Sequence, residues 1–308
     1  MRSPGRAEAE PKCLAALGAL FDKHALGRPG DVEVDRTGWV NICMFVDDVV
    51  VRFNARDPHL PKFRRECIAY RELGIRDFPV PEVLALDEDR DVCPYDVLVT
   101  NRLPGRNLEL DWASLELEQL HDLTDQAARW LDRIHHVTFI GFGEIAEGTP
   151  CTSWGQAVAT QMAFHLAEAR ELETFSPRDV AAFEALFDVA APFFDDIEVP
   201  ALVHSDYHPG NILYADTTIT GLLDFEWCFA GDPAFDLAYQ QNLDGMGFPE
   251  TFVESFGPVL DERALFRQQL YQCMRNVELS NVARRHFEAG EAERYRDVTL
   301  AHLDLVDR

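Results

Sequence analysis

The densest group of polar side chains in the sequence lies within residues 201–226. There, an apolar segment is followed by His204, Asp206 and Asn211, and a second apolar segment, reached through a short turn, ends at Asp224. The pattern predicts a strand, a loop and a tight hairpin that present these four side chains. Carboxylate, amide and imidazole groups at such spacing can bind a metal ion or accept a proton. Residues 201–226 are therefore the first candidate for a reaction centre.

Two alternatives follow from the same residues. His204, Asp206 and His208 alternate along the chain, as ligands of a transition-metal ion could. The segment could also be a polar loop with a purely structural role.

Other catalytic motifs are absent or incomplete in the sequence. No Gly-x-Ser-x-Gly elbow and no Walker A motif occurs, which excludes the usual α/β-hydrolase and P-loop chemistries. Gly141-Phe-Gly-Glu-Ile-Ala146 superficially matches a dinucleotide-binding fingerprint. A Glu-Gly-Thr-Pro segment follows it where a helix would be needed, so we expect a loop there.

The spacing in residues 204–226 resembles the catalytic region of the protein-kinase-like fold. In that fold His-x-Asp-x-x-x-x-Asn is followed, after a hairpin, by an Asp that begins a DFG-like triplet. The chain is more closely similar to the aminoglycoside phosphotransferase family, which also contains choline, homoserine and sugar kinases. That family has His-Gly-Asp-x-His-x-x-Asn, Asp-x-Glu and Gly-Asp-Pro-x-x-Asp-Leu-Ala, and this chain has counterparts at 204–211, 224–226 and 231–238. The resemblance covers about residues 30–240 and is stronger in its second half.

The resemblance implies a role for each polar residue of the segment. Phosphoryl transfer depends mainly on positioning and charge neutralisation. Asp206 is expected to orient the acceptor hydroxyl or accept its proton, with His204 beside it bracing the loop through hydrogen bonds. Asn211 and Asp224 are expected to supply oxygen ligands to Mg²⁺. Glu226 is expected either to contact the metal directly or to support the ligand Asp224 without touching the metal.

The first hundred residues contain the expected nucleotide-binding groups. Gly38 and Asn41 flank a short segment between two strands, where a kinase-like fold places its phosphate-covering loop. Arg52, in the middle of a strand, occupies the position of the family's phosphate-binding Lys, and Glu66 on the following helix is expected to pair with it. An arginine here departs from the classical kinase pattern and reaches phosphate differently. The alternative is that Arg52 is a solvent-facing strand residue.

A hinge is expected where the first hundred residues end. Asn101 and Leu103 precede Pro-Gly at 104–105, and their backbone groups are expected to bind the purine edge of ATP or GTP. The expected domains are accordingly 1–103, which binds the nucleotide, and 104–308, which holds the catalytic loop and the acceptor.

The apolar spacing predicts an α+β chain with a small β-rich first lobe and a larger, mainly helical second lobe. This agrees with the two-lobed protein-kinase-like fold. Expected strands lie near 32–34, 42–46, 49–53, 83–86 and 95–103, and expected helices near 11–25, 61–73, 114–136, 154–172, 177–191 and 261–289. Asp236, which opens an apolar helical run, is expected to brace the catalytic loop or cap a helix.

Composition narrows the class of protein. The net charge is −26, which argues against nucleic acid and anionic membrane as partners. No apolar run is long enough to cross a bilayer, and the first residues do not resemble a secretory signal. The seven cysteines form no Cys-x-x-Cys pair, which favours a reducing, cytoplasmic location.

The acidic charge is concentrated in the second lobe. Residues 1–105 hold 18 acidic and 15 basic side chains, whereas residues 106–308 hold 36 and 13. One interpretation is a solvated surface that aids solubility. The other is a field that attracts a cationic acceptor.

The predicted function is transfer of the γ-phosphate of ATP or GTP, with Mg²⁺, to a hydroxyl of a small molecule such as an aminoglycoside or another antibiotic. The alternatives are a metabolic kinase for an amino alcohol, sugar or amino acid, and a catalytically silent nucleotide-binding module. The intact Asp206, Asn211 and Asp224 disfavour the silent module. The sequence leaves the oligomeric state and the choice between ATP and GTP open.

Overall fold

The computed structural model describes residues 6–36, 41–55, 57–58, 60–146, 150–239, 248, 252 and 261–306. The chain divides into two compact units. The first consists of Met1–Arg106 and Leu213–Glu226, and the second of Asn107–Ile212 and Trp227–Arg308. The sequence places the boundary at 103/104 and does not anticipate that residues 213–226 belong with the first unit.

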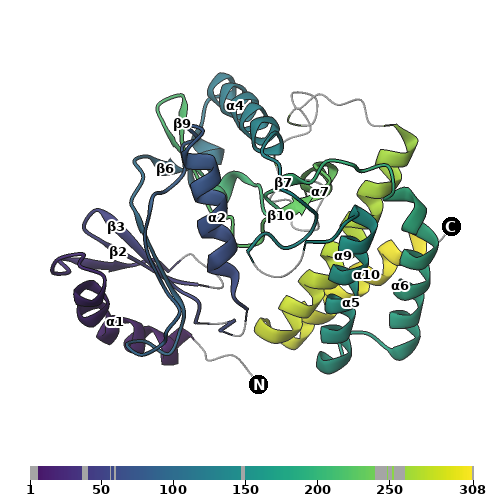
Figure 1. Ribbon diagram of the computed structural model, residues 1–308, viewed down its shortest axis with the longest axis horizontal. Coiled ribbons are helices and arrows are strands. Elements are labelled where there is room, and N and C mark those ends of the chain that lie inside the picture. The colour runs from purple at the N-terminus through teal and green to yellow at the C-terminus, as the bar shows by residue number, and fades with distance from the viewer. Residues whose placement is uncertain are drawn as a thin grey trace. The chain divides into compact units, whose positions relative to one another are not determined.

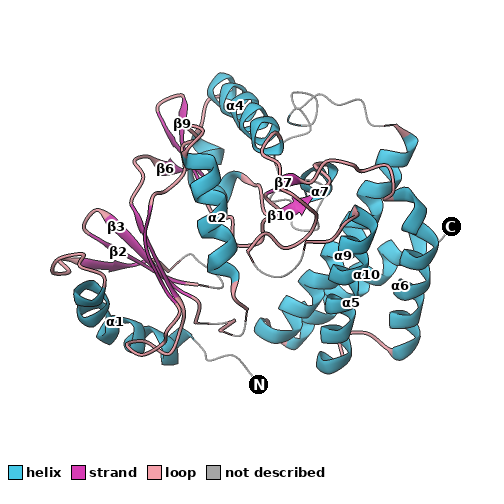
Figure 2. Ribbon diagram, in the orientation of Figure 1, coloured by secondary structure: helices cyan, strands magenta, loops and turns pink. Residues whose placement is uncertain are grey.

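The first unit is built on an antiparallel sheet of five strands in the order β1-β2-β3-β5-β4. Strands β2 and β3 of this sheet are labelled in Figure 1, and Figure 2 draws the strands in magenta. Its elements are α1 (Arg6–Lys23), β1 (Val32–Val34), β2 (Ile42–Val46), β3 (Val49–Phe53), α2 (Lys62–Gly74), β4 (Val83–Asp87) and β5 (Val97–Asn101). A second sheet has the order β6-β8-β9, with β6 at Arg106–Asn107, β8 at Ile212–Ala215 and β9 at Thr218–Leu222. The strands and the helix α2 that the sequence predicts for this region are confirmed. Helix α2 ends at Gly74, one residue beyond the end that the sequence predicts for this helix.

The alternation of β3 explains why Arg52 lies on the α2 side of the sheet. Successive side chains of a strand point to opposite faces. Val51 and Phe53 are fully buried in the core that α1 forms with β2, β3 and β5. Arg52, between them, therefore faces α2, where Phe63 and Leu98 form a smaller apolar cluster.

The second unit is mainly helical. Its elements are α3 (Leu108–Asp111), α4 (Leu117–His135), α5 (Trp154–Leu172), α6 (Pro177–Ala190), β7 (Ala201–Val203), β10 (Phe229–Gly231), α7 (Ala234–Tyr239), α9 (Glu262–His286) and α10 (Ala289–Val306), with short 3₁₀ turns at Trp112–Ser114, Ala191–Phe193 and Pro209–Asn211. Helix α9 packs against α5, α7 and α10, as Figure 1 shows. The helix expected at 261–289 is thus α9, and a separate helix, α10, follows it.

The core of the second unit supports the loop at residues 204–211. Trp154 is fully buried, stacks on Phe229 of β10 with ring centroids 5.7 Å apart, and donates its indole N–H to the Tyr271 hydroxyl. Strand β10 pairs with β7, which leads directly into residues 204–211. The buried aromatic layer therefore fixes the strand from which the loop departs.

In the part of the chain that the structure describes, no helix is long and apolar enough to span a bilayer.

Candidate active site

Asp236, near the start of α7, holds the first turn of the loop after β7. Its Oδ2 accepts the backbone N–H of His204 at 2.9 Å, and its Oδ1 accepts that of Ser205 at 2.6 Å. Nε2 of His135 lies 2.8 Å from the same Oδ2. All of these groups are buried. The expectation that Asp236 braces the loop is confirmed.

Ser205 adopts a left-handed backbone conformation, with φ of 68°. For a residue with a side chain, this region costs about 1–2 kcal/mol. The similar family has glycine at this position, so the departure to serine has a local energetic cost. The bond from the Ser205 N–H to Asp236 holds the backbone in this conformation.

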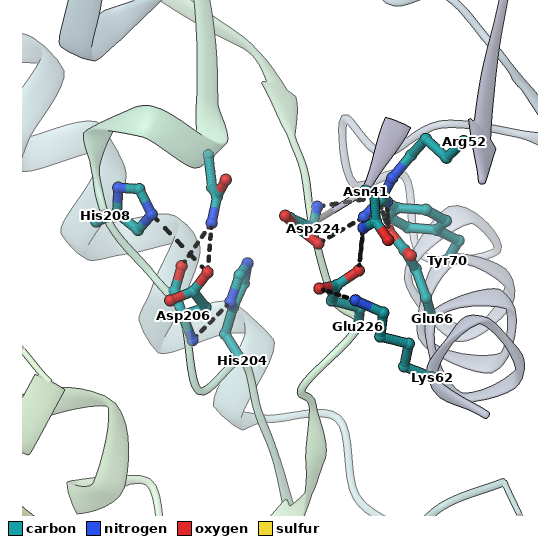
Figure 3. A network of polar contacts seen from close by, with 11 residues as sticks. Asn41, Arg52, Lys62, Glu66, Tyr70, His204, Asp206, His208, Asp224 and Glu226 are labelled. Atoms are coloured by element: carbon teal, nitrogen blue, oxygen red, sulfur yellow. Dashed lines mark hydrogen bonds and ion pairs between the residues drawn. The ribbon is translucent and has the colours of Figure 1, made fainter. Parts of the chain in front are cut away.

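Asp206 is held by donors on both sides of its carboxylate. Asn211 Nδ2 lies 2.8 Å from the Asp206 backbone oxygen and 3.2 Å from Oδ2, and a guanidinium nitrogen of Arg275 lies 3.3 Å from Oδ1. The Asp206 N–H donates to His204 Nδ1 at 3.2 Å, and His208 Nε2 is 3.9 Å from Oδ2 (Figure 3). The Asp206 side chain remains 18% exposed. It is thus a fixed carboxylate that a small molecule can still reach.

His204 has a structural position. It is fully buried, accepts from the Asp206 N–H and packs edge-on against Tyr207. Among the described residues, the donor atoms of His204, Asp206 and His208 do not gather into a metal-binding group. The transition-metal alternative is therefore not supported.

The first unit contains a separate cluster around Arg52. The Arg52 guanidinium lies 2.5 Å from Glu66 Oε1, 2.8 Å from Asp224 Oδ1 and 2.9 Å from Glu226 Oε2 (Figure 3). The Arg52 side chain is 13% exposed, so it is not a solvent-facing strand residue. Burial opposes its charge, but the three carboxylates keep the pKa of Arg52 well above its ordinary value. The predicted Arg52–Glu66 ion pair is present.

Glu226 accepts from three side chains. Lys62 Nζ lies 2.8 Å from Oε1, and Arg52 and Asn41 Nδ2 approach Oε2 at 2.9 and 2.5 Å. Both Glu226 and Lys62 are buried. Lys62 is not among the site residues that the sequence predicts. Its position four residues before Glu66 places both on one face of α2, and this spacing is the signal that could have identified it.

Tyr70, another residue that the sequence analysis missed, lies one further turn along the same face of α2. Its hydroxyl donates to Glu66 Oε1 at 2.7 Å and accepts the Asp224 N–H at 3.1 Å. Burial, followed by the nearby Glu66 carboxylate, raises the pKa of Tyr70 and keeps this hydroxyl protonated. Asp224 has a left-handed φ of 65°, and the Tyr70 bond holds its backbone there.

The carboxylates of the first unit fit a hard divalent cation. Oxygens of Glu66, Asp224 and Glu226 lie within 4.8 Å of one another, and carboxylate oxygens are the ligands that Mg²⁺ prefers. Burial, only partly opposed by Arg52, raises the pKa of Glu66 to about 7. Asp224 is the most exposed of the three, at 31%. It is therefore the carboxylate best placed to meet a metal ion that enters from solvent.

Two of the remaining predicted residues, Asn101 and Leu103, lie at the end of β5 and just after it. Gly38 lies outside the described residues. Asn101, at the end of β5, donates its N–H to the Glu82 carbonyl at 3.1 Å and accepts the Glu82 N–H on Oδ1 at 2.6 Å. Leu103 follows β5 and is half-buried. The reciprocal bonds with Glu82 fix the end of the strand that the hinge follows.

The comparisons with known proteins decide the family. The model of the phosphotransferase enzyme family matches residues 32–275. The chain belongs to this family. The phosphotransferase is therefore an enzyme of the small-molecule kinase type, in agreement with the sequence analysis.

Solved structures similar to this phosphotransferase share its fold. A thermostable mutant of aminoglycoside phosphotransferase APH(4)-Ia, in a ternary complex with AMP-PNP and hygromycin B, has a TM-score of 0.70 and 20% identity, covering 94% of this chain and 97% of that one. APH(2″)-IIa has a TM-score of 0.66 and 14% identity in its streptomycin–ATP complex, covering 92% and 94%. Its gentamicin complex has a TM-score of 0.67 at the same identity and coverage. The predicted kinase-like fold is confirmed.

Proposed function

We propose that this phosphotransferase moves the γ-phosphate of ATP or GTP to a hydroxyl of a cationic small molecule, with an aminoglycoside as the leading candidate. The principal support is the Arg52 cluster, in which one guanidinium is held by Glu66 and Asp224 inside the first unit. A fixed cation that is bound to an acid on a neighbouring helix is the usual device for positioning nucleotide phosphates in kinases.

In this proposal Arg52 binds the nucleotide phosphates, and Glu66 fixes its direction. Gly38 and Asn41 belong to the segment that covers the phosphates. Backbone groups at Asn101 and Leu103 bind the purine edge.

Asp224 and Asn211 are proposed as the protein ligands of Mg²⁺, which when bound neutralises charge on the phosphates. Nδ2 of Asn211 already donates to Asp206, so its carbonyl oxygen is the atom that it would offer to the metal. Glu226 accepts from Lys62, Arg52 and Asn41. We therefore propose that Glu226 keeps these three donor side chains in place next to Asp224.

Asp206 is proposed to orient the acceptor hydroxyl and accept its proton as the phosphoryl group is transferred. His204 braces the loop that presents it. Two facts support this role for Asp206: its carboxylate is held on both oxygens, and it is still partly exposed.

A cationic acceptor is supported by charge and by the relatives. The net charge of residues 106–308 is −23, and unlike charge speeds the encounter with a ligand. Similar solved structures contain hygromycin B, streptomycin or gentamicin. All three are amine-bearing molecules with hydroxyl groups.

The test is a transfer assay with the purified chain, Mg²⁺ and either ATP or GTP. Acceptors are hygromycin B, gentamicin, streptomycin, an amino alcohol and a neutral sugar, each followed by mass spectrometry for the gain of one phosphoryl group. Phosphorylation of an amine-bearing acceptor, lost in Asp206→Asn, is the expected result. Preference for the neutral sugar would contradict a cationic acceptor, and absence of transfer to every compound would contradict the proposed substrate class.

A further inference from the structure

Arg275 connects helix α9 to the catalytic loop. One guanidinium nitrogen lies 3.3 Å from Asp206 Oδ1, and the other terminal nitrogen lies 2.7 Å from Glu278 Oε2. The Arg275 side chain is only 7% exposed. No sequence motif relates Arg275 to Asp206, which lies 69 residues earlier in the chain.

We propose that Arg275 is a positioning residue that holds the Asp206 carboxylate in the orientation needed to meet the acceptor hydroxyl. The inference rests on the proposed role of Asp206. A carboxylate turns about its last single bond unless both oxygens are held, because that rotation is broad and weakly restricted. Asn211 holds Oδ2 and Arg275 holds Oδ1. Removal of Arg275 leaves one oxygen without its donor and allows the carboxylate to turn.

Helix α9 can supply a rigid donor at this point. Met274 and Val277, on either side of Arg275, are buried in the core of the second unit. Glu278, one turn further on, is 13% exposed and fixes the guanidinium from its other end. A guanidinium held in this way presents its N–H groups in a fixed plane, which an ammonium does not.

A second arginine on α9 provides a matched control. Arg285 forms an ion pair with Glu168 of α5, and the two side chains are 11% and 16% exposed. Their burial and charge resemble those of the Arg275–Glu278 pair. Arg285 does not contact Asp206 in the described structure.

The first experiment compares Arg275→Met, Arg275→Lys and Arg285→Met with the wild-type chain. Turnover of ATP and of GTP is measured with hygromycin B, gentamicin and streptomycin as acceptors, and also without acceptor. Displacement of a reacting group by about 1 Å can cost 10²-fold in rate, so we expect kcat to fall by about 10- to 100-fold in Arg275→Met, with the nucleotide KM within about twofold. Arg275→Lys should recover part of kcat, and Arg285→Met should retain wild-type kcat.

The second experiment places Arg275→Met in the Asp206→Asn background. If Arg275 acts through Asp206, its removal costs much less there than in the wild type, because residues that act as one unit are not additive. Equal losses in both backgrounds, or an equal loss in Arg285→Met, would overturn the inference. Should Arg275→Met fail to fold, Glu278→Gln releases the guanidinium with its charge retained and should lower kcat alone.

The outcomes separate this inference from the proposed function. A wild-type chain that transfers phosphate and an Arg275→Met variant with unchanged kcat overturn only the role of Arg275. A wild-type chain that turns over no nucleotide, with or without acceptor, overturns both.

Discussion

The ammonium of Lys62 lies 2.8 Å from Oε1 of Glu226, with the lysine fully buried and the glutamate side chain 4% exposed. Lys62 begins helix α2, and Glu226 comes 164 residues later, two residues after Asp224. The pair therefore fixes the start of α2 to the segment that presents Asp224. Glu66 and Tyr70, on the same face of the helix, complete the arrangement.

Lys62→Met should destabilise the protein strongly. Without Lys62, Glu226 shares the Arg52 guanidinium with Glu66 and Asp224, so the buried cluster has one cation for three carboxylates. Removal of one partner of a buried ion pair costs about 3–5 kcal/mol. Chemical denaturation measures this loss. Lys12→Met is the control, because Lys12 pairs with Glu8 on the surface and such pairs contribute about 0–1 kcal/mol. Equal stability losses in the two variants would contradict a structural role for the Lys62–Glu226 pair.

Asp206→Asn should nearly abolish transfer and leave nucleotide binding intact. A positioned proton acceptor contributes about 10²–10⁴-fold to the rate, and the substitution keeps the shape of the side chain. Steady-state turnover and Mg·ATP or Mg·GTP calorimetry measure the two effects. Asp122→Asn, on the exposed face of α4, should match the wild type. A loss smaller than tenfold for Asp206→Asn would argue against its role.

Asp224→Asn should weaken binding of the Mg²⁺–nucleotide complex. Asparagine tolerates the left-handed backbone found at this position better than most residues, so the change removes the negative charge with little strain. Calorimetry of Mg·ATP and Mg·GTP, with Asp224→Ala as a second variant, tests the effect. If both variants bind and react like the wild type, Asp224 is not a metal ligand.

His165 should make the stability of the second unit sensitive to acid. Burial lowers the pKa of His165, and although Glu278 opposes this shift, Arg275 and Arg285 add to it. Below its ordinary pKa of about 6.5, the unfolded chain binds a proton that the folded chain does not, so stability falls as the pH falls through this value. His165→Asn should therefore lose less stability than the wild type between pH 7.5 and 5.5.

The control for this pH effect is His136→Asn, because the His136 side chain is 77% exposed. Its stability should follow the wild-type curve. Parallel curves for the wild type and His165→Asn would show that His165 does not titrate differently on folding.

The KM for a cationic acceptor should rise with salt. The Debye length falls from about 10 Å at 0.1 M salt to about 3 Å at 1 M, which screens the acidic field of residues 106–308. The measurement is a salt series with the nucleotide saturating, and a neutral sugar acceptor serves as the control. A KM that does not change with salt would mean that the acidic side chains only solvate the surface.

The sequence by itself determined the loop at residues 204–211, which resembles the family pattern, and most of the helices and strands. The spacing of His204, Asp206, Asn211 and Asp224 predicts one loop and one hairpin, because those elements need few residues and their turn signals are local. The strand around Arg52 is likewise predicted from a local run of β-branched residues, whereas the alternative of a solvent-facing Arg52 is excluded only by the structure. The family match and the described helices and strands confirm these expectations.

The contacts of Lys62 and Arg275 were decided only by the tertiary structure. Each of these two side chains lies on a helix, and its partner is far away in the sequence. Helical periodicity indicates which face of a helix is buried, but it does not indicate which residues cover that face. The backbone N–H groups of residues 204 and 205 likewise donate to Asp236, about 30 residues later in the chain, and these bonds hold Ser205 in its left-handed conformation. Such long-range pairing depends on how helices pack, and local sequence patterns do not specify that packing.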